Sequence, residues 1–218
     1  MTAPTHKEQL LALLARLSFR LGQFTLASGA TSDYYIDCRT TTLHAEGGRL
    51  TGHAILELLE AHNIQAEAVG GLTMGADPIV SNVATASAQR AIEDRGTLDR
   101  HSQSNPATSD KTNLIHGFLV RKAEKTHGTA RRIEGFLQPG ARVIIVDDVC
   151  TTGGSAITAI EAAREAGMVI AAVVCIVERQ EANGRPAVES AAHGAPFLAL
   201  FTADDVRAEK IKQATSAP

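Results

Sequence analysis

The sequence predicts an α/β fold in which helices flank a mostly parallel sheet. From about residue 46 onward, short apolar strands alternate with longer helical segments, which is typical of parallel sheets with right-handed crossovers. Aromatic residues make up only 4% of the 218 residues and Trp is absent, so the core depends on Ala, Val, Ile and Leu. Small aliphatic side chains suit helices packed closely on a buried sheet better than an aromatic-rich β sandwich. We expect one domain over residues 1–218.

The N-terminal region is expected to form a small hood over about residues 1–40. Thr5 and Glu8 have the spacing of a capping box ahead of periodic leucines, and Gly22 is the expected end of this first helix. Two β-prone segments, 23–26 and 34–38, flank a turn-rich stretch and predict a hairpin. The other expected elements are helices at 46–62, 76–90 and 155–166, strands at 68–70, 118–120, 143–146, 170–177 and 197–201, and a helix after 202.

Residues 97–113 lack apolar periodicity and are rich in Ser, Asn, Asp and Thr, which predicts a surface insertion. A linker between two domains is the alternative, disfavoured because we assign the following strand to the same sheet.

Composition argues against several classes of partner. The net charge of −3 gives no overall attraction to nucleic acid or to an anionic membrane. Three widely spaced cysteines show no zinc-ligand spacing and suit a reducing compartment. No apolar run approaches the roughly 20 residues of a membrane span, and the first residues lack the layout of a signal peptide. We therefore expect a cytoplasmic protein that binds neither nucleic acid nor membranes.

The sharpest motif is the segment 143–155, an apolar strand followed by two acids and a loop of hydroxyl residues and glycines. Ligands of open α/β sheets bind beyond the carboxyl ends of the strands. Gly153 and Gly154 allow close approach of the backbone, and the following helix N-terminus suits a phosphate. The pattern is neither a nucleotide-binding P-loop nor a dinucleotide-binding fingerprint. Asp147 and Asp148 before such a loop favour a phosphorylated ribose, whereas the bland alternative is a solvated turn.

This segment resembles the phosphoribosyl pyrophosphate motif of the type I phosphoribosyltransferases. The resemblance implies that Asp147 and Asp148 face the ribose hydroxyls and stabilise a cationic ribose in the transition state. It also implies that the loop binds the phosphoribosyl group through Val149, Cys150, Thr151, Thr152, Gly153, Gly154 and Ser155. No activating group adjoins Cys150 in the sequence, so we interpret its thiol as a small packing group.

A basic segment resembles the catalytic loop of the orotate phosphoribosyltransferases. Residues 121–132 contain five Lys and Arg against one acid, in a chain that is negative overall. Such a loop can close over a pyrophosphate, exclude water and neutralise the leaving group. The resemblance makes Lys125 the transition-state cation and assigns Arg121, Lys122 and His127 to pyrophosphate. An ordinary solvated loop or a nucleic-acid patch is the alternative reading of the basic residues taken alone.

Two further segments resemble the orotate branch. Residues 24–37 resemble its hood, which covers the base, and Arg179 lies in a segment whose arginine holds the carboxylate or carbonyl of orotate. The chain departs from many relatives at Ala27 and at Met74, in the presumed pyrophosphate loop 70–76, where those relatives carry Lys. Taken alone, a tyrosine pair or a strand-end arginine is more often structural.

The resemblance as a whole implies a Mg²⁺-dependent transfer of ribose 5-phosphate from phosphoribosyl pyrophosphate to orotate, with the metal carried mainly by the substrate and no dedicated protein metal site. It also implies a homodimer in which the basic loop reaches the neighbouring site. A phosphoribosyltransferase for a purine or uracil is one alternative. A non-catalytic regulator that senses phosphoribosyl pyrophosphate is the other, disfavoured by the retained Lys125 and His127.

Overall fold

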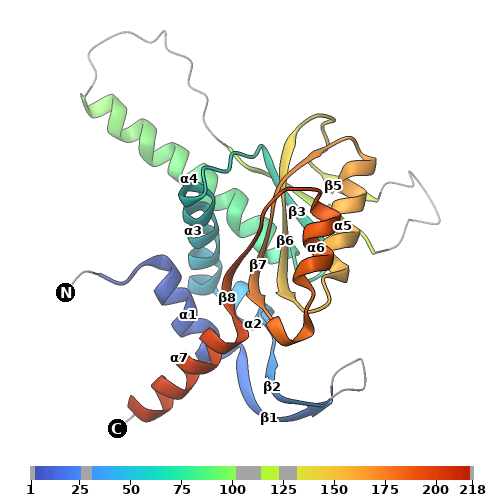
Figure 1. Ribbon diagram of the computed structural model, residues 1–218. Coiled ribbons are helices and arrows are strands. Elements are labelled where there is room, and N and C mark those ends of the chain that lie inside the picture. Colours follow the sequence, from blue (N-terminus) through green and yellow to red (C-terminus); the bar gives the residue numbers. More distant parts are fainter. Residues whose placement is uncertain (1–2, 26–30, 102–113, 123–131, 217–218) are drawn as a thin grey trace.

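The computed structural model describes residues 3–25, 31–101, 114–122 and 132–216, and for 94–101 it describes the backbone alone. Its centre is a six-stranded sheet in the order β5-β4-β3-β6-β7-β8 (Figure 1). The β4–β5 pair is antiparallel and the other neighbours are parallel, as expected for a mostly parallel sheet. The strands are β3 Ala68–Leu72, β4 His116–Val120, β5 Ile133–Gly135, β6 Arg142–Cys150, β7 Val169–Glu178 and β8 Phe197–Thr202.

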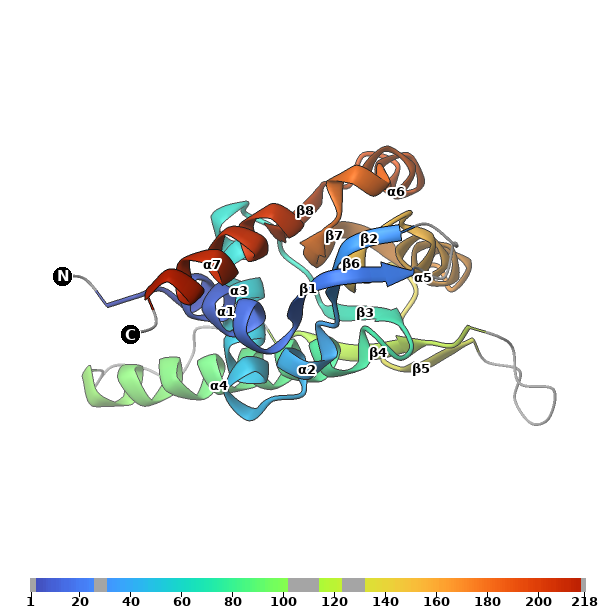
Figure 2. The ribbon, with the colours of Figure 1, turned by 90° about the horizontal axis from the view of Figure 1, so that it is seen from below.

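Helices cover both faces of this sheet (Figure 2). On one face lie α1 His6–Leu17, α3 Ala45–Ala61 and α4 Asp77–His101, and on the other lie α5 Gly154–Glu165 and α6 Arg185–Ala192. Side chains of β6 alternate between the two cores, because Ile144 and Val146 pack on the first face and Val143 and Ile145 on the second. A central strand buried on both sides explains why its sequence reads as a continuous apolar run.

The direction in which the chain adds strands to the sheet reverses between β3 and β6. From β3 the chain adds β4 and β5 on one side, and from β6 it adds β7 and β8 on the other. Such a switch point opens a crevice beyond the carboxyl ends of the two central strands, and ligands of open α/β sheets bind there. The loops after β3 and β6 therefore occupy the expected ligand site.

The hood is an antiparallel hairpin of β1 Phe19–Thr25 and β2 Thr31–Ile36. It is followed by the short helix α2 Arg39–Thr42 and contacts the C-terminal helix α7 Ala203–Ser216. Helix α7 lies beside α1, so both ends of the described chain lie on the same side of the molecule (Figures 1 and 2). The capping box at Thr5 and Glu8 is present as predicted.

Several boundaries differ from the sequence prediction. The first helix ends at Leu17 rather than Gly22, because the buried Ser18 hydroxyl bonds to Thr41 and Phe19 enters the core as the start of a strand. Helix α4 continues to His101, into the segment expected as an insertion, and Gln89 bonds to Glu93 one turn later. Residues 102–113 of that segment lie outside the described residues. Strand β5 and helices α2 and α6 were not predicted.

Candidate active site

Two adjoining clefts open at the carboxyl ends of the central strands. The larger, of about 1100 Å³, lies between the hood, the end of β7 and α7, and the smaller, of about 450 Å³, lies between the loops after β3 and β6. Both clefts are lined by Thr151 and Arg179. They therefore form two parts of one site at the switch point.

The loop after β6 has the geometry of an anion-binding turn. Gly153 has a φ of 80° and caps α5, a backbone conformation that glycine adopts without steric cost. A Cβ at Gly153 would lie 2.3 Å from Cγ2 of Val188, so α6 packs directly beneath the loop. Thr151, Thr152 and Ser155 are exposed at the start of α5, where backbone amides and the helix dipole favour a phosphate.

The two acids before this loop are placed differently. Asp148 lines the smaller cleft, whereas Asp147 is 7% exposed and does not line either cleft. Burial, and then the neighbouring Asp148 charge, raise the pKa of Asp147 to about 7. Burial also raises the pKa of Asp148, and its Oδ1 accepts a 2.9 Å hydrogen bond from the amide of Val149. Of the pair, Asp148 is thus the carboxylate that faces the smaller cleft.

The loop after β3 closes the smaller cleft from the other side. Gly75 lies against Asp148, and Met74, which is 68% exposed, lines the same cleft with Lys122. The backbone of this loop therefore faces the carboxylate and the phosphate loop together. Met74 supplies an apolar surface at this position.

Arg179 follows directly after β7 and is largely buried. Its amide donates to the carbonyl of Cys150 over 2.9 Å, which ties the two strand ends together. Its guanidinium Nε donates to the Tyr34 hydroxyl at 2.9 Å and to Oε1 of Glu181 at 3.0 Å. The structure thus brings the predicted base-binding arginine to the hood and the clefts.

Other predicted residues lie elsewhere. Arg121 pairs with Glu134 at 3.0 Å and does not line either cleft. The Cys150 thiol is buried, and burial, with the nearby Asp147 charge, raises its pKa to about 11, so it is a protonated packing group. Lys125, His127 and Ala27 lie outside the described residues.

Among the polar side chains that line the clefts, the sequence interpretation did not assign Asp37, Arg39, Glu181 and Arg207 to the site. Asp37 and Arg39 line the smaller cleft and form a paired salt bridge, whose Nε–Oδ1 distance is 2.9 Å. Glu181 and Arg207 line the larger cleft. Asp37 lies at the end of the hood segment and Glu181 lies two residues after Arg179, so their positions in the sequence could have identified them as site residues. No such indication exists in the sequence for Arg207, because this residue lies on the C-terminal helix, far from the recognised motifs.

Two properties of the described residues concern metals and membranes. No three or more His, Cys, Asp and Glu side chains among them are grouped to hold a metal ion. No helix in the same part of the chain is long and apolar enough to span a bilayer.

Comparison with known proteins gives a consistent family. A phosphoribosyl transferase domain model matches residues 95–190. The orotate phosphoribosyltransferase of Thermosynechococcus vestitus is 43% identical over 203 residues, covering 93% of each chain. That of Streptomyces coelicolor is 38% identical, covering 85% of this chain and 88% of the relative.

Solved structures agree with the sequence relatives. The orotate phosphoribosyltransferase of Mycobacterium tuberculosis, in complex with Fe(III) dicitrate, superposes with a TM-score of 0.69 at 32% identity, covering 92% of this chain and 98% of the other. The same protein in complex with 5-phospho-alpha-D-ribosyl 1-diphosphate gives a TM-score of 0.66 at 30% identity, covering 93% and 99%. Given the identity and coverage of these relatives, the chain belongs to the orotate phosphoribosyltransferase family.

Proposed function

We propose that this protein transfers ribose 5-phosphate from phosphoribosyl pyrophosphate to orotate, giving orotidine 5′-phosphate and pyrophosphate, as in the synthesis of UMP. The observation that carries the proposal is the identity of 43% over nearly the whole length of an orotate phosphoribosyltransferase. The shape of the site supports it, because an anion-binding turn, a carboxylate and a buried arginine line adjoining clefts.

The phosphate loop and the two acids bind different parts of the sugar phosphate. We assign the 5-phosphate to the exposed hydroxyls of Thr151, Thr152 and Ser155 and to the amides of the same turn. Asp148 faces the ribose hydroxyls from the smaller cleft. Asp147, buried beside it with a pKa of about 7, adds negative potential as the anomeric carbon becomes cationic, to the extent that it is ionised. Val149, Cys150, Gly153 and Gly154 contribute through the backbone.

The reaction exchanges one bond at the anomeric carbon for another. The bond to pyrophosphate breaks and its electron pair leaves with the oxygen, while a ring nitrogen of orotate forms the new bond. Positive charge on the ribose and negative charge on the leaving group develop together. We assign Lys125 to the leaving group, with Lys122 and His127 binding pyrophosphate. Lys122 at the rim of the smaller cleft supports this assignment. The assignment of Arg121 to pyrophosphate rests on the family resemblance alone, because in this structure Arg121 pairs with Glu134 and lines neither cleft.

Orotate is assigned to Arg179, whose planar guanidinium suits a carboxylate. The hood strand β2 and its Tyr34 would cover the base. Ala27 and Met74 replace the lysines of many relatives, so on this proposal the affinity for substrate depends more on Arg179 and on backbone amides.

Mg²⁺ is the proposed cofactor. The carboxylates of Asp37 and Asp148 line the smaller cleft, and hard oxygen donors in small number suit a Mg²⁺ that keeps most of its ligands from water and substrate. The metal would be carried mainly by the pyrophosphate and hydroxyls of the substrate and would neutralise charge there, and Asp148 would contribute a protein oxygen, because both oxygens of Asp37 are paired with Arg39.

We further propose one domain acting as a twofold homodimer in which the basic loop reaches the partner's site. A reducing, cytoplasmic setting is proposed on the three buried cysteines, which are free thiols.

The test mixes the purified protein with phosphoribosyl pyrophosphate, Mg²⁺ and one base at a time, and follows pyrophosphate release. Release with orotate is expected. Release with adenine, guanine or uracil in its place would overturn the substrate, and no release with any base would favour a regulator. Lys125→Ala should lower kcat strongly while thermal unfolding stays unchanged, and an unaltered kcat would refute its role.

A further inference from the structure

Arg179 is held from one side by three hydroxyl and carboxylate groups. Its Nε is shared between the Tyr34 hydroxyl at 2.9 Å and Glu181 Oε1 at 3.0 Å, and its Nη2 donates to Ser32 Oγ at 3.2 Å. Tyr34 in turn donates to the same Oε1 of Glu181. The guanidinium, the phenol and the carboxylate therefore close a three-membered hydrogen-bonded ring.

The partners of Arg179 belong to one cleft only. Ser32, Tyr34 and Glu181 all line the larger cleft and none lines the smaller one, whereas Arg179 lines both. Within the described part of the chain, Nη1 makes no hydrogen bond, in contrast to Nε and Nη2. The contacts thus hold Nε and Nη2 among groups of the larger cleft and leave Nη1 without a hydrogen bond among the described residues, so that it can bind a ligand.

The Tyr34 side chain is a stable anchor for this arrangement. Its ring stacks on Phe19 with centroids 5.3 Å apart, and the guanidinium carbons of Arg179 and Arg207 lie 4.5 Å and 5.0 Å from its centre. Burial, and then the hydrogen bond to Glu181, raise the pKa of Tyr34 to about 12, so the phenol remains a donor. Arg207 also pairs with Asp33 at 2.7 Å, which fastens α7 to the hood strand.

We propose that Glu181 and the Tyr34 hydroxyl are positioning residues that orient Arg179 toward the carboxylate of the base. This inference rests on the proposed function, in which Arg179 meets that carboxylate. Long side chains lose considerable rotamer entropy when fixed, and the ring of hydrogen bonds removes that cost before the substrate arrives. Displacing a binding group by about 1 Å costs up to ~100-fold in rate, so loss of the ring should be measurable.

The contacts of Glu181 also distinguish a positioning role from competition with the substrate. A carboxylate near an arginine can instead compete with the carboxylate of the substrate and keep it out. Glu181 contacts Nε alone and leaves Nη1 available, and its side chain is 54% exposed at the edge of the larger cleft. We therefore expect removal of Glu181 to weaken orotate binding rather than to strengthen it.

The experiment compares steady-state kinetics of the full-length protein with those of Glu181→Ala, Glu181→Gln and Tyr34→Phe. Glu181→Ala should raise the KM for orotate about tenfold, equivalent to about 1.4 kcal/mol, with the KM for phosphoribosyl pyrophosphate changed less than about twofold. Glu181→Gln should recover much of the loss, because its amide oxygen still accepts from Nε and from Tyr34. Tyr34→Phe should fall between the two.

Glu189→Ala is the matched control. Glu189 is 50% exposed and pairs with Arg185, yet it lines neither cleft, so both KM values should stay unchanged. A lower KM for orotate in Glu181→Ala would show competition and overturn the proposal. Equal rises in both KM values, or no change in either, would also overturn it. A wild-type protein that does not use orotate would instead refute the proposed function itself, and the inference with it.

Discussion

Gly75 and Asp148 approach each other so closely that a Cβ at position 75 would lie 2.6 Å from Oδ1 of the aspartate. Contacts of that length do not occur between a Cβ and an oxygen without movement of one of them. The loop after β3 and the acid after β6 are therefore fitted to each other across the switch point of the sheet. Glycine at this position lets the backbone face the carboxylate directly.

Gly75→Ala is expected to displace the Asp148 carboxylate and to lower kcat/KM for phosphoribosyl pyrophosphate by roughly 10- to 100-fold. Stability should change little, because Gly75 does not have the positive φ that an L-residue resists. Steady-state kinetics with thermal unfolding measure both quantities.

The contrasting variant is Gly140→Ala. Gly140 has a φ of +82°, and a Cβ at this position would meet nothing within 4 Å, so alanine there should cost about 1 kcal/mol of stability and leave kcat/KM intact. If Gly75→Ala kept full activity, the close approach of Gly75 to Asp148 would not matter for catalysis.

Helices and strands were predictable from the sequence where a segment has one clear pattern of apolar residues. The continuous apolar run of β6 and the periodic leucines of α1 each specify an element by burial alone. Strand β5 has only three residues and pairs at an edge with β4, so no periodicity can reveal it. Helix α6 is stabilised by packing under the phosphate loop, which a local sequence pattern does not report.

The site was predictable to the same degree. Thr151, Thr152, Ser155 and Arg179 follow directly from strand ends, because parallel strands bring their carboxyl ends to one edge. The different burial of Asp147 and Asp148 was not predictable. Adjacent side chains point to opposite faces only where both residues belong to a strand, and these two residues were expected to follow the strand. The strand was expected to stop at 146, and it continues to Cys150.

Arg185 and Glu178 form the next testable contact. Glu178 is buried at the end of β7, where Arg185 pairs with it through Nε at 2.9 Å and through Nη2. Arg185→Ala leaves that carboxylate buried without its partner, and the expected cost is about 1 to 3 kcal/mol of unfolding free energy, because the Arg185 side chain itself is 39% exposed. Urea unfolding at constant pH measures it.

The double variant Glu178→Gln with Arg185→Ala provides the check. It should be clearly more stable than Arg185→Ala alone, because the uncompensated charge is gone. Loss of the exposed partner in Glu189→Ala should cost less than about 1 kcal/mol. Additive costs in the double variant would contradict a coupling between the two side chains.

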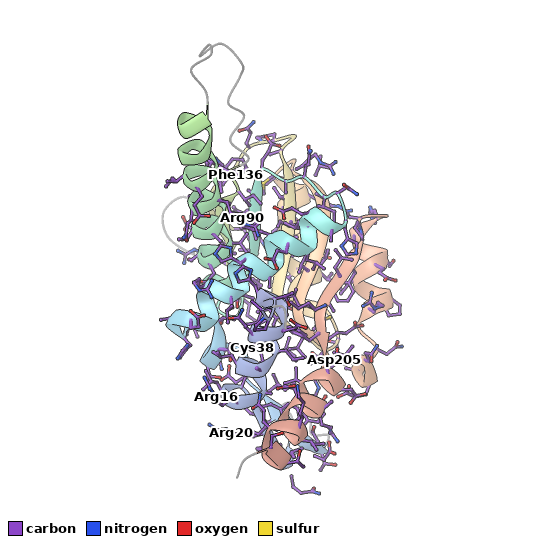
Figure 3. All side chains as sticks on the ribbon, turned by 90° about the vertical axis from the view of Figure 1, so that its left-hand side faces the viewer. Arg16, Arg20, Cys38, Arg90, Phe136 and Asp205 are labelled. Carbon is purple, nitrogen blue, oxygen red and sulfur yellow. The ribbon has the colours of Figure 1, made fainter. Side chains whose placement is uncertain are left out.

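His53 is expected to make stability depend on pH. It is buried on α3, and its ring stacks on His6 at 4.7 Å. Nη2 of Arg90, which is labelled in Figure 3, donates to the backbone carbonyl of His53 at 3.5 Å. Burial, followed by the charges of His6 and Arg90, lowers the pKa of His53 below its usual 6.5. The unfolded chain therefore binds a proton first as the pH falls, and stability decreases on acidification below about 6.5.

His53→Gln should remove this component. Between pH 7.5 and 5.5 the wild type should lose up to about 1 kcal/mol more than the variant, measured as urea midpoints at both pH values. A steeper loss in His53→Gln than in the wild type would reverse the sign and contradict the assignment.

Cys150 tests whether the thiol beside the phosphate loop takes part in the chemistry. Its pKa of about 11, which results first from burial and then from the charge of Asp147, leaves almost no thiolate at neutral pH. Cys150→Ala retains the carbonyl that accepts the amide of Arg179, so kcat/KM should stay within about twofold, with a stability cost of about 1 kcal/mol from the small cavity. Iodoacetamide should react with the native protein far more slowly than with the urea-unfolded chain. Rapid inactivation that Cys150→Ala abolishes would show instead that the thiol is open to the clefts and ionised.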